Sequence, residues 1–193
     1  MGELTESERV EIESNREIID SVPKVIVYGG ISVMVWIFTM LVYIPLGGGL
    51  MLTPDLSVSN FIMIIGFAAL LFFTVKILKE IKDISNAIGG IIAVKSGPSG
   101  ASKEEVKHMQ TAVRGVIYAI VGTILFVFLT SVLRGLNMGG NAYLGQTIVG
   151  IGLVVMFIWV IFLLYRSGMA VSKELEKAAH EKAAKMLEEA AKD

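Results

Sequence analysis

Hydroxyl side chains recur at helical spacing in two apolar stretches of the sequence, where each set would give a helix one polar face. The first set is Tyr28, Ser32, Thr39 and Tyr43, and the second is Thr123 and Thr130, followed by Arg134. Intervals of four and seven residues place each set on one side of an α-helix. Two interpretations stay open. The hydroxyls bond the backbone of their own or a neighbouring helix, or the two faces line a hydrated path in an assembly of several chains. The candidate pore-facing residues are Ser32, Thr39, Thr123, Thr130 and Arg134.

Other reactive groups are scarce. The chain has no cysteine, which excludes disulfides, thiolate catalysis and metal clusters held by cysteine. Its two histidines, His108 and His180, lie in separate polar segments, and no cluster of metal ligands surrounds either of them in the sequence. Glycine-rich phosphate loops, a His-Glu-x-x-His motif and a Ser/His/Asp set are also missing. We therefore expect no enzymatic activity, no metal and no cofactor.

The apolar stretches define the class of protein. Hydrophobic residues make up 54% of the 193 residues and charged residues only 18%, with a mean hydropathy of +0.69. Four stretches carry no charge: residues 25–54, 56–75, 115–133 and 135–165. A helix needs about 20 apolar residues to cross a bilayer. The sequence therefore predicts an all-α polytopic membrane protein, a bundle of four transmembrane helices at about 25–46, 57–76, 114–134 and 143–166.

Lysine and arginine are distributed unevenly around these spans. Arg134 is the only one in the loops that follow the first and third spans, and all the others lie in the N-terminal, middle and C-terminal segments. The positive-inside rule then places both termini and the middle segment in the cytoplasm, and we expect the plasma membrane. The N-terminal residues 1–22 are acidic, unlike a secretory signal, so the first span is expected to be retained.

The second half of the chain resembles the first. Tyr28 matches Tyr118 at an offset of 90 residues, and Gly66 matches Gly152 at an offset of 86. We therefore expect two parallel two-span hairpins related by a tandem repeat. The predicted domains are an acidic cytoplasmic N-terminal helix (1–23), a first hairpin with a cytoplasmic extension (24–94), a linker (95–101), a second hairpin (102–166) and a cytoplasmic C-terminal helix (167–193).

Local patterns mark the starts of two helices outside the apolar stretches. Thr5 with Glu8, and Ser102 with Glu105, have the spacing of capping boxes. The first of these helices is expected to run to about residue 20, with Pro23 marking the turn into the membrane.

Isoleucines continue past the second span with the spacing of a packed helical seam. They recur at intervals of four, three and four residues, and we name Ile77, Ile81, Ile84 and Ile88 the isoleucine seam. The charge pairs expected beside it are Lys76 with Glu80 and Lys79 with Asp83. The run covers fewer than two heptads. It is a candidate oligomer seam, and the alternative is packing against other helices of the same chain.

These features predict an oligomeric integral membrane protein. Four closely packed helices leave no open channel between them, so a channel-like function requires a path formed between subunits. That function is our first hypothesis, and the second is a non-conducting scaffold or accessory subunit that presents cytoplasmic helices to a partner. An exporter ranks third because the spans lack charge at their centres. The expected partners are the lipid bilayer, further copies of the chain and, for a scaffold, a cytoplasmic protein, with no nucleic acid.

Overall fold

Helices account for nearly all of the chain in the computed structural model, which describes residues 5–54, 56–96, 102–134 and 143–190. The four long helices are α1 (Glu6–Ile37), α3 (Val58–Ser96), α4 (Lys103–Leu133) and α5 (Leu144–Ala190). A π-helical turn, η1 (Phe38–Tyr43), and the short helix α2 (Ile44–Leu46) extend α1. Two short strands, β1 (Met51–Thr53) and β2 (Leu56–Ser57), pair antiparallel before α3 begins.

Four helical segments are long and apolar enough to span a membrane, the first of which runs from α1 through η1 and α2. These segments are Ser7–Leu46, Val58–Lys95, Lys103–Leu133 and Leu144–Lys173. Each of them includes most of one of the four charge-free stretches of the sequence. Large hydrophobic side chains are exposed on all four helices, as expected for surfaces that face hydrocarbon. The prediction of an all-helical, multi-pass membrane protein is confirmed at the level of length and composition.

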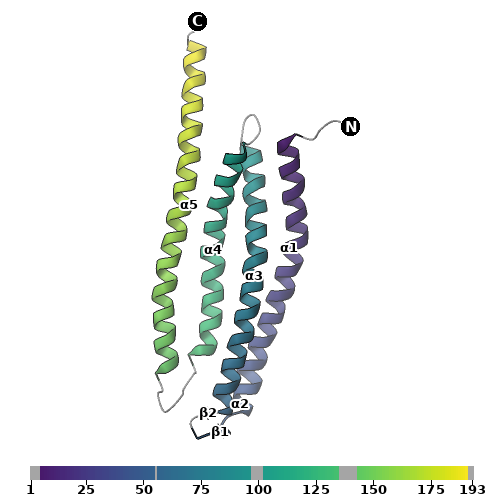
Figure 1. The fold of residues 1–193 in the computed structure, drawn as a ribbon, viewed down its shortest axis with the longest axis vertical. Coiled ribbons are helices and arrows are strands. Elements are labelled where there is room, and N and C mark those ends of the chain that lie inside the picture. The colour runs from purple at the N-terminus through teal and green to yellow at the C-terminus, as the bar shows by residue number, and fades with distance from the viewer. Residues whose placement is uncertain (1–4, 55, 97–101, 135–142, 191–193) are drawn as a thin grey trace.

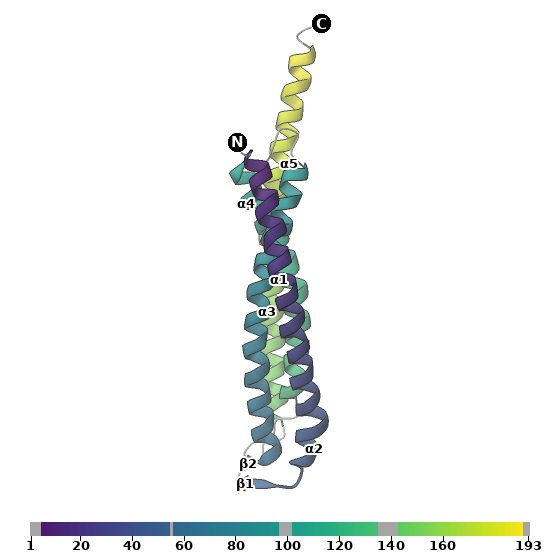
Figure 2. The same ribbon diagram turned by 90° about the vertical axis from the view of Figure 1, so that its right-hand side faces the viewer.

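The long helices lie side by side in chain order (Figure 1). α1 packs along α3, α3 along α4 and α4 along α5, and no other pair of long helices in the described residues packs along its length. Turned by 90°, the helices overlap in a thin profile (Figure 2). The expected bundle is therefore an open row with α1 and α5 at its free edges. Apolar edges are compatible with lipid, which removes the need to enclose them in a core.

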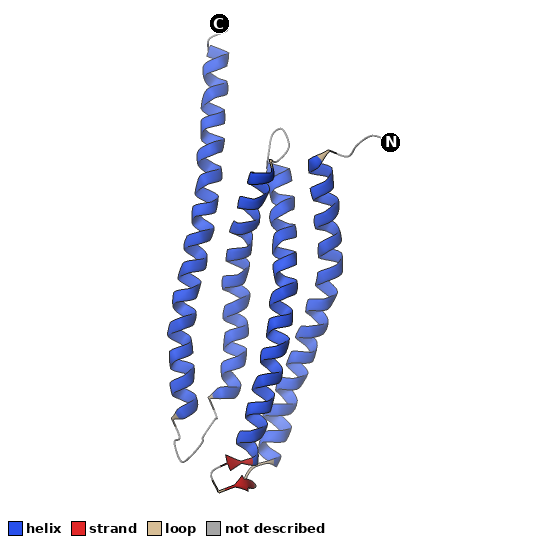
Figure 3. Cartoon of the chain, in the orientation of Figure 1, coloured by secondary structure: helices blue, strands red, loops and turns tan. Residues whose placement is uncertain are grey.

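The two ends of the row differ. The start of α1, the end of α3, the start of α4 and the end of α5 lie at one end (Figure 1), which we call the basic end because the lysine- and arginine-rich segments are there. The opposite end holds the strands (Figure 3), and we call it the loop end.

Most of the predicted linker, residues 97–101, lies outside the described residues. Two hairpins require the pairs α1–α3 and α4–α5, but α3 packs along α4 as well. The two-hairpin division and the tandem repeat stay predictions.

The first helix departs from the sequence prediction around Pro23. It runs without a break from Glu6 to Ile37, with Pro23 inside it, instead of ending near residue 20. A proline removes one backbone hydrogen bond, but packing against a neighbouring helix compensates for that loss in membrane helices. The two predicted capping boxes are confirmed, at Thr5 and at Ser102.

The loop end contains a small hydrophobic core where three helices meet. Its buried members are Met63, Leu70 and Val132. Trp36 of α1 reaches across to α4, where its ring centroid lies 5.6 Å from that of Phe128 and its Nε1 donates to Ser131 Oγ at 2.8 Å. These contacts tie α1 to α4 at the loop end.

Glycines set the distance between α3 and its neighbours. Gly89 lies against the backbone of α4, where an added methyl group would come within 2.5 Å of the Gln110 Cα. Gly66 lies against Thr39 of η1, where an added methyl group would come within 2.6 Å of the Thr39 Cγ2. Small residues allow helix backbones to approach closely, which is a main source of helix association in lipid.

We expect Gly89→Ala to destabilise the protein by about 1–3 kcal/mol, because the added methyl group would force the α3 and α4 backbones apart. The matched control is Gly168→Ala in α5, where an added methyl group meets nothing within 4 Å. Alanine also favours helix over glycine, so the control should be neutral or slightly stabilising. Thermal unfolding of both variants in detergent measures the difference. Equal melting temperatures would contradict the close contact at Gly89.

Candidate functional site

Most of the predicted pore-facing hydroxyls form hydrogen bonds within the chain. Ser32 and Thr130 are buried, whereas Thr123 is exposed. All three donate to carbonyl oxygens of their own helices, at 2.8 Å for Ser32, 3.0 Å for Thr130 and 2.6 Å for Thr123. Thr39 is buried against Gly66 of α3, and Ser32 lies two turns before it on the same side of the helix. The structure therefore places two of the five candidates on the α1 side of the row and three on α4.

Thr123 and Arg134 are both exposed on the same side of α4, and Arg134 caps the end of this helix. They are eleven residues apart, which is close to three full helical turns. The same surface carries Ile120, Ile124 and Val127, which are 57%, 62% and 62% exposed. This face is therefore apolar apart from one hydroxyl, already bonded to its own backbone, and one charge at the loop end.

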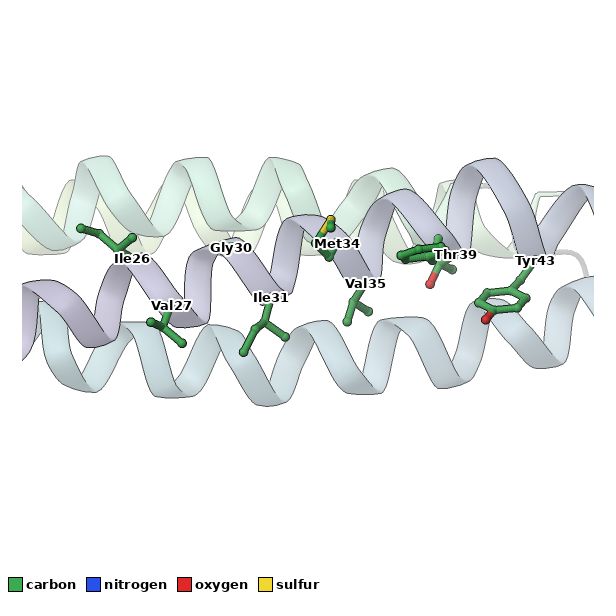
Figure 4. A pocket seen from close by; sticks show the side chains of 9 residues that line it. Ile26, Val27, Gly30, Ile31, Met34, Val35, Thr39 and Tyr43 are labelled. Carbon is green, nitrogen blue, oxygen red and sulfur yellow. The ribbon is translucent and has the colours of Figure 1, made fainter.

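An apolar groove runs along α1 and η1 (Figure 4). Its volume is about 600 Å³, and its lining residues are Ile26, Val27, Gly30, Ile31, Met34, Val35, Phe38, Thr39 and Tyr43. Gly30 contributes no side chain, and an added methyl group there would meet nothing within 4 Å. The groove is thus a feature of the surface of α1 and η1, and it is open to lipid or to another helix.

The isoleucine seam lies on α3, the helix that has neighbours on both sides. Ile77 is buried, and Ile81, Ile84 and Ile88 are half-buried. Packing within one chain already covers much of this seam, as the intramolecular alternative expects. Its use between copies of the chain stays a prediction.

Charged groups at the basic end join α1 to α3. Lys24 Nζ lies 2.5 Å from a carboxylate oxygen of Asp20 and 3.9 Å from one of Glu80. The hydrogen bond to Asp20 is the main reason that the pKa of Lys24 is raised. The expected pair of Lys76 with Glu80 is wrong for this structure, because Glu80 is 8% exposed and faces Lys24. Lys76 instead lies over the ring of Phe72, 5.5 Å from its centroid.

Acidic side chains also meet between these two helices. Burial raises the pKa of Glu17, and the neighbouring charges of Asp83 and Glu13 raise it further. The expected ion pair of Lys79 with Asp83 does not form within the described residues. Neither Glu17 nor Asp83 forms an ion pair within the described residues.

The described residues bring together no group of three or more His, Cys, Asp or Glu side chains that could hold a metal ion.

Comparison with known proteins gives a relative of similar length. The uncharacterized protein MJ1114 of Methanocaldococcus jannaschii is 27% identical over 192 residues, which cover 96% of each chain. No family model and no solved structure matches the chain. The similarity thus spans all four apolar helices.

We expect Glu17→Gln to raise the melting temperature at neutral pH. Because the folded-state pKa of Glu17 lies above the ordinary value of 4.5, the folded chain holds this proton more tightly than the unfolded chain does. Ionisation of Glu17 therefore costs stability as the pH rises above 4.5, and the cost is complete above the raised folded-state pKa.

Melting temperatures between about pH 4 and pH 8 check this expectation. The exposed Glu11 lies on the same helix, so Glu11→Gln is the control and should follow the wild type. Parallel curves for the two variants would show that burial of the Glu17 carboxylate does not affect folding.

Proposed function

We propose that this protein is an oligomeric membrane scaffold or accessory subunit that presents helices at its basic end to a protein partner. The observation that carries the proposal is the free end of α5, which continues well past the other three helices (Figure 1). A helix of 47 residues is about 70 Å long, roughly twice the thickness of the hydrocarbon core. Val171 and Leu175, in the part beyond the charge-free stretch, are 40% and 65% exposed. That part of α5 offers apolar side chains to a partner.

The placement of the hydroxyls favours a scaffold over a channel. Ser32 and Thr130 are buried inside the chain, and Thr39, which lines the α1 groove, is only 5% exposed. A conducting path needs polar groups or wetted walls along its length. The exposed surfaces of the four apolar helices are instead rich in isoleucine, valine, leucine and phenylalanine.

Association of several copies is part of the proposal. A row with two free edges can continue from one copy to the next by packing α5 of one chain near α1 of another. The groove at Gly30 supports this arrangement, because a concave surface beside a glycine can accept a side chain from a neighbouring helix. The bilayer surrounds the remaining apolar surface.

We further propose that the basic end lies in the cytoplasm, at the plasma membrane. The excess of lysine and arginine supports this orientation, and the termini share that end of the row with the α3–α4 connection.

The tandem repeat also gains support. Gly66 contacts Thr39 of the preceding helical segment, and the matching Gly152 contacts Phe126 of its own preceding helix. The offset between the two contacted residues, 87, is close to the offset of 86 between the glycines.

A conducting path between subunits is the second candidate function. It is favoured by the exposed positions of Thr123 and Arg134, which share one face of α4. Several copies with this face turned toward a common axis would place a ring of hydroxyls in the membrane and a ring of positive charge at the loop end.

The orientation is tested with single cysteines, since the native chain has none. We expect Thr53→Cys, at the exposed loop end, to react with a membrane-impermeant thiol reagent in intact cells. Lys107→Cys, exposed at the basic end, should react only after the membrane is permeabilised. Labelling of Lys107→Cys in intact cells would reverse the proposed orientation.

The scaffold function is tested by placing a photo-crosslinking amino acid at Leu175 in living cells. We expect a discrete adduct with a second protein, because this side chain is exposed beyond the spans. The matched control is the same amino acid at Ile124, which is equally exposed but lies within a span and should give no protein adduct of that mass. Purified wild-type protein should pass no ions in proteoliposomes.

The opposite result would favour the channel. If Leu175 crosslinks only to further copies of the chain, and the wild-type protein conducts ions at a rate that falls in Thr123→Leu, the scaffold proposal is wrong.

A further inference from the structure

A small polar cavity lies between α4 and α5 at the basic end. Its volume is about 200 Å³, and its lining residues are Thr111, Arg114, Gly115, Tyr118, Leu163, Arg166 and Ser167. Pockets for drug-sized ligands usually enclose about 300–1,000 Å³. This cavity therefore suits one small polar group, not a large ligand.

Two arginines from different helices give the cavity its charge. Arg114 comes from α4 and Arg166 from α5, and no carboxylate is among the lining residues. Neither arginine forms an ion pair within the described residues. The guanidinium group presents a planar fork of donors that matches the oxygens of a phosphate or a carboxylate. The pair therefore favours an anion with several oxygens.

Ser167 supplies a hydroxyl that the protein itself does not use. It is 3% exposed, and its Oγ has no hydrogen-bond partner within the described residues. The other two hydroxyls of the cavity are engaged. Thr111 donates to the carbonyl of Lys107 at 2.8 Å, and Tyr118 donates to the carbonyl of Leu78 at 3.1 Å. Buried hydroxyls are nearly always satisfied, so an unused one in a positively charged cavity points to a ligand.

The position of the cavity along the membrane normal indicates where such a ligand would come from. Arg114 immediately precedes the charge-free stretch 115–133, and Arg166 immediately follows the stretch 135–165. This boundary corresponds to the depth of lipid headgroups, where basic pockets between helices bind phosphate-bearing lipids. Leu163 lies one turn deeper on α5 and provides an apolar wall on the membrane side. Gly115 leaves room for the Ser167 hydroxyl, since an added methyl group would overlap it.

We propose that this cavity binds a phosphate group, with Arg114 and Arg166 as charged donors and the Ser167 hydroxyl as a third donor. The headgroup of an anionic phospholipid places such a group at the right depth, and inorganic phosphate offers the same chemistry from solution. The site does not depend on whether the protein acts as a scaffold or as a channel.

Native mass spectrometry of the full-length, delipidated protein tests the site, with phosphatidylglycerol and inorganic phosphate as separate probes. We expect the wild type to bind one added phosphatidylglycerol per chain. The double variant Arg114→Gln, Arg166→Gln should bind it at least about tenfold more weakly, because two charge-assisted contacts are lost. Ser167→Ala should weaken binding by about threefold. The control pair Lys79→Gln, Lys82→Gln removes two exposed positive charges of α3 outside the cavity and should leave binding unchanged.

Binding of inorganic phosphate with the same dependence on these variants, without binding of the lipid, would identify a site for the free ion. The proposal is wrong if neither probe binds the wild type, or if the arginine variant binds both as tightly as the wild type does. If the arginine variant fails to fold, Ser167→Ala decides the question, since it keeps every charge and the packing against Gly115. Unchanged binding in that variant would then overturn the proposal.

Discussion

Hydrocarbon offers no hydrogen-bond partner to a backbone amide or a hydroxyl, and most of this structure follows from that constraint. The apolar segments that could span the membrane are helical because an interrupted helix would expose unpaired backbone groups to lipid. Ser32, Thr123 and Thr130 donate to carbonyls of their own helices for the same reason. In such a chain, a hydroxyl group first finds its hydrogen-bond partner in the backbone of its own helix.

The same solvent changes how the helices hold together. Apolar side chains gain little by leaving lipid, so the row has only a small core and turns most of its large side chains outward. Cohesion comes from close contacts of the α3 backbone, at Gly66 with the Thr39 side chain of η1 and at Gly89 with the backbone of α4. α3 is flanked on both sides, which explains why the isoleucine seam is largely covered within one chain.

Features that depend on one helix at a time were predictable from the sequence. Charge-free length located the four apolar helices, and side-chain spacing located the capping boxes at Thr5 and Ser102. Contacts between helices were not predictable, because no pattern within a single helix encodes its rotation against a neighbour. The sequence predicts an ion pair of Glu80 with Lys76, one turn away on the same helix, whereas Lys24 of α1 is the cation that faces Glu80. Ser167 has no distinguishing feature in the sequence, and its unused hydroxyl becomes apparent only once α5 lies on α4.

The continuity of α1 gives the molecule a mechanical property. This helix is anchored to α3 by Lys24 at the basic end and to α4 by Trp36 at the loop end. Its regular hydrogen-bond ladder is interrupted at Pro23 and in η1, which lie just outside the two anchors. The segment between the two interruptions keeps the regular hydrogen bonding of an α-helix. Bending of α1 is therefore expected at Pro23 and in η1, at the two ends of this segment.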